Sequence, residues 1–179
     1  MADRFTNKQV KGTGDTIPIV SIVGRSGAGR TTLLEKLIPE LRRRGYRVAT
    51  VKHHAHPGFE VDQPGKDTWR HAQAGSEQVV IAAPDRVAAI RYVDHALTLD
   101  EITATIIRDV DIILTEGYRG ANKPKIEVVR AARGREPLCS PEELLAIASD
   151  VELALGVPRF DLDDAAGLVD LIETCFLCS

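Results

Sequence analysis

Residues 24–31, Gly-Arg-Ser-Gly-Ala-Gly-Arg-Thr, have the types and the spacing that can bind a phosphate group. Glycines let consecutive backbone N–H groups wrap an anion, and the N-terminus of a following helix adds the positive end of its dipole. The segment matches the pattern G-x-x-x-x-G-K-[ST] at every fixed position except the lysine, which is Arg30. The residues predicted to bind nucleotide phosphates are Gly24, Ser26, Gly27, Ala28, Gly29, Arg30, Thr31 and Thr32.

Arg30 changes what this loop is expected to do. An arginine is longer and forked, so it can pair with phosphate but does not copy the geometry of the compact lysine ammonium. We therefore expect nucleotide to bind and its hydrolysis to be weak. The alternative is a glycine-rich turn that holds no ligand.

Carboxylates that can serve Mg²⁺ occur in two other segments. Glu116 ends the apolar run 109–117, and in a parallel sheet ligands lie at the carboxyl ends of the strands. Asp62 and Asp67 flank the turn at Pro64-Gly65. With the hydroxyl of Thr31, these three acids are the predicted magnesium-side residues. Asp67 can equally be a helix cap, and its spacing alone does not decide between the two roles.

The charges are unevenly distributed along the chain. The 179 residues carry 23 basic and 26 acidic side chains, a formal charge of −3, which excludes a uniformly basic nucleic-acid binder. Residues 119–135 nevertheless hold six bases and one acid, and residues 140–179 hold one base and nine acids. The basic stretch follows Glu116, so Arg119, Lys123 and Lys125 are predicted to face an anion or a partner. A merely solvated face is the ordinary alternative.

Histidines and cysteines provide two weaker signals. His53, His54 and His56 can bind a transition metal, or they can form hydrogen bonds in a polar loop. Cys175 and Cys178 close the last predicted helix, whereas a redox Cys-x-x-Cys opens one, so we expect a frayed helix end. The three cysteines make no disulfide framework, which favours a reducing, cytoplasmic compartment.

Strands and helices alternate along the predicted structure. Apolar runs predict strands at 17–23, 47–52, 111–115, 125–129 and 156–160, a hairpin over 78–93, and helices beginning at Thr31, Asp67, Leu99 and Asp163. Residues 144–148 fit either a helix or a strand. This order predicts an α/β fold, a P-loop NTPase-like three-layer sandwich with a mainly parallel sheet and a β-hairpin. We expect a flexible tail over 1–16, a single domain over 17–179 and no membrane segment.

Several segments together resemble one family. They are Gly24–Thr31, Val51-Lys-His-His, Val61-Asp-Gln-Pro-Gly-Lys-Asp-Thr, Ala74-Gly75, Thr115-Glu-Gly-Tyr and Pro124-Lys-Ile-Glu-Val. Over residues 17–174 the chain resembles MobB, the adaptor family of molybdopterin-guanine dinucleotide biosynthesis. The resemblance implies a homodimeric, weakly hydrolysing GTP-binding protein that uses Mg²⁺. Its implied partner is molybdopterin guanylyltransferase, the enzyme that attaches GMP to molybdopterin, or another molybdenum cofactor protein.

Guanine selection has no obvious signature, because the usual Asn-Lys-x-Asp sequence is absent. Asp150, which follows a possible strand, is the candidate for accepting the guanine N–H groups; the alternative is an N-cap for residues 151–155. Competing functions are a small-molecule P-loop kinase, a metal-insertion GTPase that uses the His53–His56 loop, and a nucleotide-dependent interaction module without turnover. The scarcity of aromatic residues among the bases argues against single-stranded nucleic acid as a partner.

Overall fold

The computed structural model describes residues 17–54, 56 and 58–178, which form two compact units. The first unit comprises residues up to 53 and from 106 onward, and the second comprises residues 54–105. The first unit contains β1 (Ile19–Gly24), α1 (Arg30–Arg43), β2 (Val48–Lys52), β5 (Ile112–Glu116), β6 (Lys125–Val129), η2 (Ala131–Arg133), β7 (Leu144–Ser149), β8 (Arg159–Phe160), α4 (Ala165–Ile172) and η3 (Glu173–Leu177). The second contains α2 (Asp67–Gln73), β3 (Gln78–Ala83), β4 (Arg86–Arg91) and nearly all of α3 (Leu99–Ile106).

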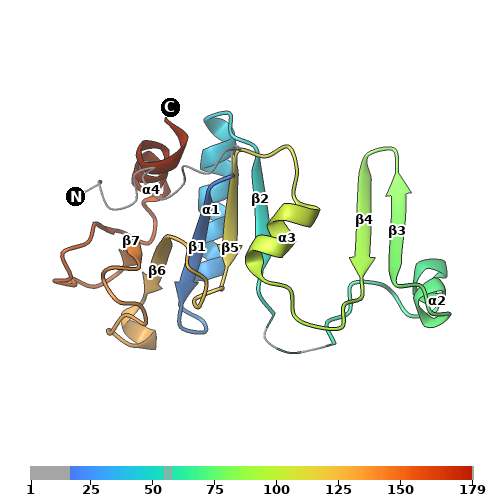
Figure 1. The fold of residues 1–179 in the computed structure, drawn as a ribbon. Helices are drawn as coiled ribbons and strands as arrows, with labels where there is room; N and C mark the ends of the chain where they lie inside the picture. The colour runs from blue at the N-terminus through green and yellow to red at the C-terminus, as the bar shows by residue number, and fades with distance from the viewer. Residues whose placement is uncertain (1–16, 55, 57, 179) are drawn as a thin grey trace. The chain divides into compact units, whose positions relative to one another are not determined.

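A six-stranded sheet organises the first unit. Its strand order is β2-β5-β1-β6-β7-β8, and every neighbouring pair is parallel (Figure 1). The carboxyl ends of the six strands therefore meet at one edge, which also receives the phosphate loop after β1. Together with the hairpin of the second unit, this sheet confirms the predicted α/β fold, and residues 144–149 form a strand.

Apolar periodicity explains which helices cover the sheet. Leu33, Leu34, Leu37 and Leu41 form the buried stripe of α1. This stripe packs into one core with α4, whose buried residues are Leu168, Val169 and Ile172, and with alternate residues of the strands, such as Val20 and Ile22. The opposite face of the sheet contributes Val23, Val129 and Ile147 to a second cluster. Strands that are buried on both faces have near-continuous apolar sequences, as β1, β5 and β7 do.

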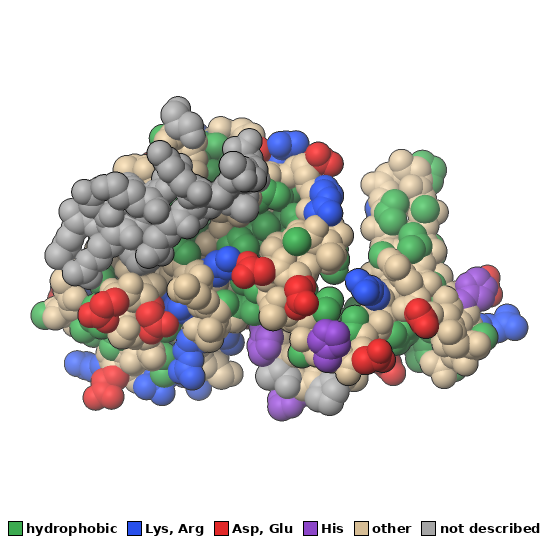
Figure 2. Space-filling model, in the orientation of Figure 1, with side chains coloured by type: hydrophobic (Ala, Val, Ile, Leu, Met, Phe, Trp, Pro, Cys, Tyr) green, Lys and Arg blue, Asp and Glu red, His purple; other side chains and the backbone are tan. Residues whose placement is uncertain are grey.

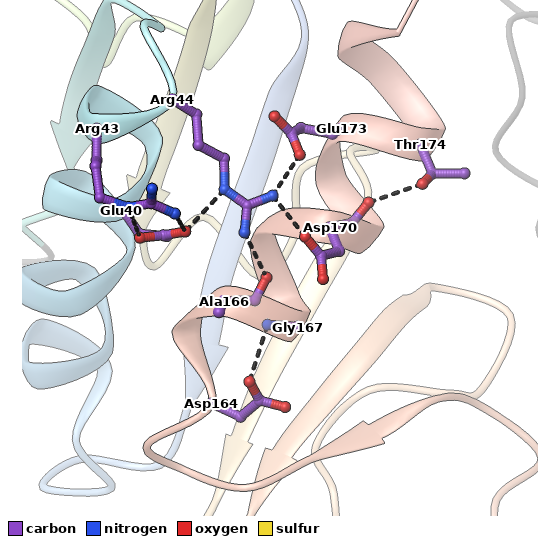
Figure 3. Close-up of polar contacts among 9 residues, drawn as sticks. All are labelled: Glu40, Arg43, Arg44, Asp164, Ala166, Gly167, Asp170, Glu173 and Thr174. Atoms are coloured by element: carbon purple, nitrogen blue, oxygen red, sulfur yellow. Dashed lines mark hydrogen bonds and ion pairs between the residues drawn. The ribbon is translucent and has the colours of Figure 1, made fainter.

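A polar cluster joins the end of α1 to α4 (Figure 3). The guanidinium of Arg44 donates to the carboxylates of Glu40, Asp170 and Glu173, and also to the carbonyl of Ala166. Arg43 binds the same Glu40 through two further hydrogen bonds, of 2.8 and 2.7 Å. These hydrogen bonds to Arg43 and Arg44 lower the pKa of Glu40 to about 2.

Acid should weaken this cluster in a definite pH range. The pKa of Glu40 is lower in the folded chain, so its contribution to stability is complete above its ordinary value of 4.5 and is lost as pH falls toward about 2. We expect the urea-unfolding midpoints of the wild type and Glu40→Gln to differ at pH 6 and to converge between pH 4.5 and 2. Glu35→Gln, an exposed change on the same helix, should follow the wild type at every pH. A constant difference between the wild type and Glu40→Gln would contradict the assignment.

The second unit contains the predicted hairpin. β3 and β4 pair antiparallel, with Gln78 opposite Arg91 and Ala83 opposite Arg86, and Pro84-Asp85 forms the turn. α2 begins at Asp67, as the sequence predicts. The single domain expected over 17–179 stays a prediction, and the tail expected over 1–16 lies outside the described residues. Across the described parts of the chain, no helix has the length and the apolar character that a membrane span requires.

Candidate functional site

The phosphate loop connects β1 to α1 in the predicted strand–loop–helix order. Gly24, Gly27 and Gly29 have φ values of 146°, 73° and 104°, which side-chain-bearing residues rarely adopt. At Gly24 the constraint is also steric, because a Cβ there would lie 2.5 Å from the carbonyl oxygen of Val128 on β6. The glycines thus set the path of the loop and hold it against the neighbouring strand.

The structure brings together two of the predicted magnesium-side residues. The hydroxyl of Thr31, in the first turn of α1, donates to Glu116 Oε2 at 3.0 Å. The Nζ atom of Lys52, at the end of β2, lies 3.6 Å from the same carboxylate oxygen, and only 12 % of the Glu116 side chain is exposed. A hydroxyl and a carboxylate are the oxygen ligands that Mg²⁺ accepts while it keeps waters and substrate phosphates as its other ligands. The pair therefore fits a magnesium ion shared with a nucleotide.

Strand pairing fixes the position of Glu116. The residue lies opposite Ile22 in β1 and Lys52 in β2, and the N–H of Gly117 donates to the carbonyl of Ile22 at 2.9 Å. Gly117 adopts a φ of 93°, and a Cβ there would lie 3.1 Å from the Cβ of His53. Chain direction therefore changes directly after the carboxylate, which remains at the edge of the sheet beside the phosphate loop.

Asp62 and Asp67 belong to the second unit. Asp62 accepts a hydrogen bond from the N–H of Gln63 at 2.8 Å. Asp67 begins α2, and its Oδ1 atom lies 3.7 Å from Nη1 of Arg70, one turn later in the helix. These contacts describe local turn and helix structure, and a magnesium role for either acid stays a prediction.

Lys125 corrects the prediction of an anion-facing side chain. It is 3 % exposed, and its Nζ lies 3.0 Å from Glu143 Oε1. A buried lysine needs a partner, so this one is committed to an ion pair with Glu143, whose side chain is 43 % exposed, and the hydrogen bond lowers the pKa of Glu143. Arg119 is exposed and Lys123 is half-buried in the connection between β5 and β6, and their contact with an anion or a partner stays a prediction.

Two other arginines of the basic stretch contact the phosphate loop, and neither was among the predicted site residues. A Cβ at Gly27 would lie 3.1 Å from the guanidinium of Arg133, and one at Gly29 would lie 3.4 Å from Nη2 of Arg130. Figure 2 shows basic side chains gathered at the margin of the first unit where β1 and β6 end. Their spacing of three residues, directly after a predicted strand, was the available sequence signal.

Asp150 follows β7 at the same edge of the sheet. Its carboxylate accepts a hydrogen bond from the N–H of Ala131 at 2.8 Å, and it is exposed. The alternative N-cap role is not observed, because residues 151–155 form no helix and the Asp150 carboxylate accepts from Ala131 instead. Guanine recognition by Asp150 stays a prediction.

The histidine loop forms no closed metal site in the described part of the chain. His54 and His56 have ring centroids 6.0 Å apart, whereas His53 packs against Tyr118 with centroids 5.0 Å apart. No group of three or more His, Cys, Asp or Glu side chains is arranged to hold a metal ion among the residues that the structure describes.

Comparison with known proteins decides the family. The family model "MobB: Molybdopterin guanine dinucleotide synthesis protein B" matches residues 19–150. The chain belongs to the MobB family. The molybdopterin-guanine dinucleotide biosynthesis adapter protein of Haemophilus influenzae is 37 % identical over 158 residues, 88 % of each chain. The Escherichia coli adapter protein is 37 % identical over 161 residues, 87 % of this chain and 91 % of its own.

Solved MobB structures agree with this assignment. A crystal structure of molybdopterin-guanine biosynthesis protein B has a TM-score of 0.68 at 34 % identity and covers 87 % of this chain and 98 % of its own. Bacillus subtilis MobB has a TM-score of 0.69 at 25 % identity, covering 90 % and 99 %. The resemblance inferred from the motifs is thus confirmed, as is the role of this MobB chain as an adapter in molybdopterin-guanine dinucleotide biosynthesis.

Proposed function

We propose that this MobB-family adapter binds GTP together with Mg²⁺ at the phosphate loop and hydrolyses it weakly or not at all. The contact between Thr31 Oγ1 and Glu116 Oε2 carries the proposal, because it joins the phosphate loop to the acidic end of β5. The loop N–H groups and the N-terminus of α1 would hold the phosphates. Mg²⁺, when bound, would neutralise phosphate charge, with Thr31 and Glu116 as its protein ligands directly or through water.

Arg30 supports weak turnover. It occupies the first position of α1, where the motif places the lysine that reaches the β- and γ-phosphates. Its planar guanidinium can bind a phosphate oxygen but does not present the lysine point charge at the same place. Nucleotide binding would then serve recognition more than hydrolysis, which suits an adapter of the enzyme that joins GMP to molybdopterin.

Removing the Thr31 hydroxyl tests the magnesium site. We expect Thr31→Val to raise the Kd for GTP by about tenfold or more in Mg²⁺, because a metal ligand is lost. In EDTA the Kd values of the variant and the wild type should differ little. Thr174→Val, an exposed change in η3, serves as the control and should leave both Kd values unchanged. Isothermal titration calorimetry measures this, and an equal loss of affinity with and without Mg²⁺ would contradict the role of Thr31.

Asp150 is the proposed guanine-selecting residue. Its place after β7 puts a carboxylate at the edge of the sheet that carries the phosphate loop. Oδ1 accepts one hydrogen bond, from Ala131, which leaves Oδ2 and the second lone pair of Oδ1 for a base. A carboxylate can accept both N–H groups of guanine.

The hairpin is the proposed contact between two copies of the chain. A two-stranded sheet is marginally stable alone, and its open edges favour pairing with another strand. Val80 and Val87 lie on one face of the hairpin and Ile81 on the other, and the three side chains are 55 %, 67 % and 57 % exposed. Apolar side chains on both faces support a homodimer that buries them.

Charge on the hairpin should weaken this dimer. We expect the wild type to sediment as a dimer and Val87→Lys to move toward the monomer, because burying an unpaired ammonium is unfavourable. Val61→Lys, which charges an equally exposed valine outside the hairpin, is the matched control and should remain dimeric. Analytical ultracentrifugation that finds a monomeric wild type, or a dimeric Val87→Lys, would contradict this interface.

A further inference from the structure

Arg130 lies against Gly29 of the phosphate loop and Arg133 lies against Gly27, although about one hundred residues separate the partners in the sequence. The guanidinium carbon, Nε and Nη2 of Arg133 each lie 3.1 Å from the place where a Cβ of Gly27 would be. Nη2 of Arg130 lies 3.4 Å from the corresponding place at Gly29. The space that these glycines leave is thus occupied by two guanidinium groups.

Local backbone structure places the two arginines together. Residues 131–133 form η2, a single 3₁₀ turn whose N-cap is Arg130. A 3₁₀ helix has three residues per turn, so side chains three positions apart project in the same direction. Gly134 then turns the chain with a φ of 114°, beside the guanidinium of Arg25, another phosphate-loop residue. Arg25, Arg130 and Arg133 line one shallow depression of the surface, which encloses no cavity.

These guanidinium groups are only partly compensated by carboxylates of the protein, since Arg130 is close enough to Asp163 to help Lys36 lower the pKa of that carboxylate. Among the described residues, the side chain of Arg133 forms no hydrogen bond or ion pair, and the buried Nε of Arg130 has no hydrogen-bond partner. Within the described part of the chain, the side chain of Arg25 donates only to the backbone carbonyl of Glu136, at 3.4 Å. Glu127 and Glu136 line the same region, and the two carboxylate oxygens of Glu127 accept hydrogen bonds from the N–H groups of Leu138 and Cys139, so among the described residues Glu127 forms no direct ion pair with these arginines. Cationic groups gathered on a loop rich in N–H donors are suited to an anion.

We propose that Arg130 and Arg133 bind the phosphate chain of the ligand that the phosphate loop holds. A guanidinium presents parallel N–H donors that match two phosphate oxygens, which a lysine ammonium does not. The two arginines then supply, from the segment after β6, positive charge at the loop whose own lysine is replaced by Arg30. This inference rests on the proposed function for the identity of the nucleotide, but its chemistry requires only linked phosphates.

Two probes separate this inference from the proposed function. GTP carries the base and the phosphates, whereas tripolyphosphate carries the phosphates alone. Calorimetry in Mg²⁺ should show that Arg133→Gln raises the Kd for both probes by about tenfold or more, and that Arg130→Gln does the same. The salt dependence of binding should become shallower in each variant, because a phosphate contact is lost. Arg133→Lys should recover part of the affinity.

Controls exclude an effect of folding or of total charge. Arg135→Gln removes an exposed arginine of the same stretch and should leave both Kd values within about twofold of wild type. Unchanged thermal midpoints of the Arg130 and Arg133 variants show that the loop stays folded. Wild-type binding of tripolyphosphate but not of GTP, with loss in the variants, would refute the proposed function and support this inference. Wild-type affinity and salt dependence in both glutamine variants, or no wild-type binding of either probe, would overturn it.

Discussion

Gly24→Ala is expected to lower the free energy of unfolding by about 3 kcal/mol and to abolish nucleotide binding. Two effects add at this position. The φ of 146° is strained for any residue with a Cβ, and that Cβ would lie 2.5 Å from the carbonyl oxygen of Val128. The obstacle is backbone of β6 in the middle of a parallel sheet, so it cannot move aside as a flexible side chain can.

Urea unfolding monitored by circular dichroism measures the effect of this change. Gly120→Ala is the matched control, because its added Cβ meets no atom within 4 Å and its φ is not positive. The control should change the free energy of unfolding by less than about 0.5 kcal/mol. A Gly24→Ala variant with wild-type stability would show that β1 and β6 do not approach as closely as described.

Glu127→Gln is expected to destabilise the chain by about 3 kcal/mol. Glu127 is 1 % exposed, and its two oxygens accept hydrogen bonds from Leu138 N at 2.6 Å and Cys139 N at 3.0 Å. An amide of the same shape has only one oxygen, so its NH₂ group would face a backbone N–H donor in the interior. The segment after η2 would then lose one of the two contacts that hold it to β6.

Glu127 is buried, whereas Glu142 is exposed, so the two residues form a matched pair for this test. Glu142→Gln, an exposed change in the same region, should leave the free energy of unfolding within about 0.5 kcal/mol of wild type. Because the loop after β6 also carries Arg130 and Arg133, Glu127→Gln should weaken ligand binding as well. Equal stability of the two glutamine variants would refute the buried role of Glu127.

Consecutive residues were enough to predict the phosphate loop and most of the sheet. The glycines of 24–29 follow a β-branched run and precede a leucine stripe, and each of these signals is local. The position of Glu116 could be predicted because parallel strands end at one edge of the sheet. In the structure its Oε2 atom lies 3.0 Å from Oγ1 of Thr31.

Two kinds of feature could not be predicted from the local sequence: the environment of a side chain, and contacts between residues far apart in the chain. Lys125 was predicted to face an anion, but it is buried in β6 and its charge is paired with the carboxylate of Glu143. The contacts of Arg130 and Arg133 with Gly29 and Gly27 join residues about one hundred positions apart, and the three-residue spacing of the arginines after a predicted strand does not say which residues they contact. Asp62 and Asp67 lie in a separate unit, so their spacing in the sequence says nothing of their distance from the phosphate loop.

Calorimetric titration of the wild-type chain with GTP and with ATP, each with Mg²⁺ and with EDTA, tests the central proposal most directly. We predict that GTP binds at least about tenfold more tightly than ATP and that EDTA weakens the binding of GTP. GTP in the same samples should remain largely unhydrolysed, as Arg30 leads us to expect. Tighter binding of ATP than of GTP, or no binding of GTP with Mg²⁺, would contradict the account.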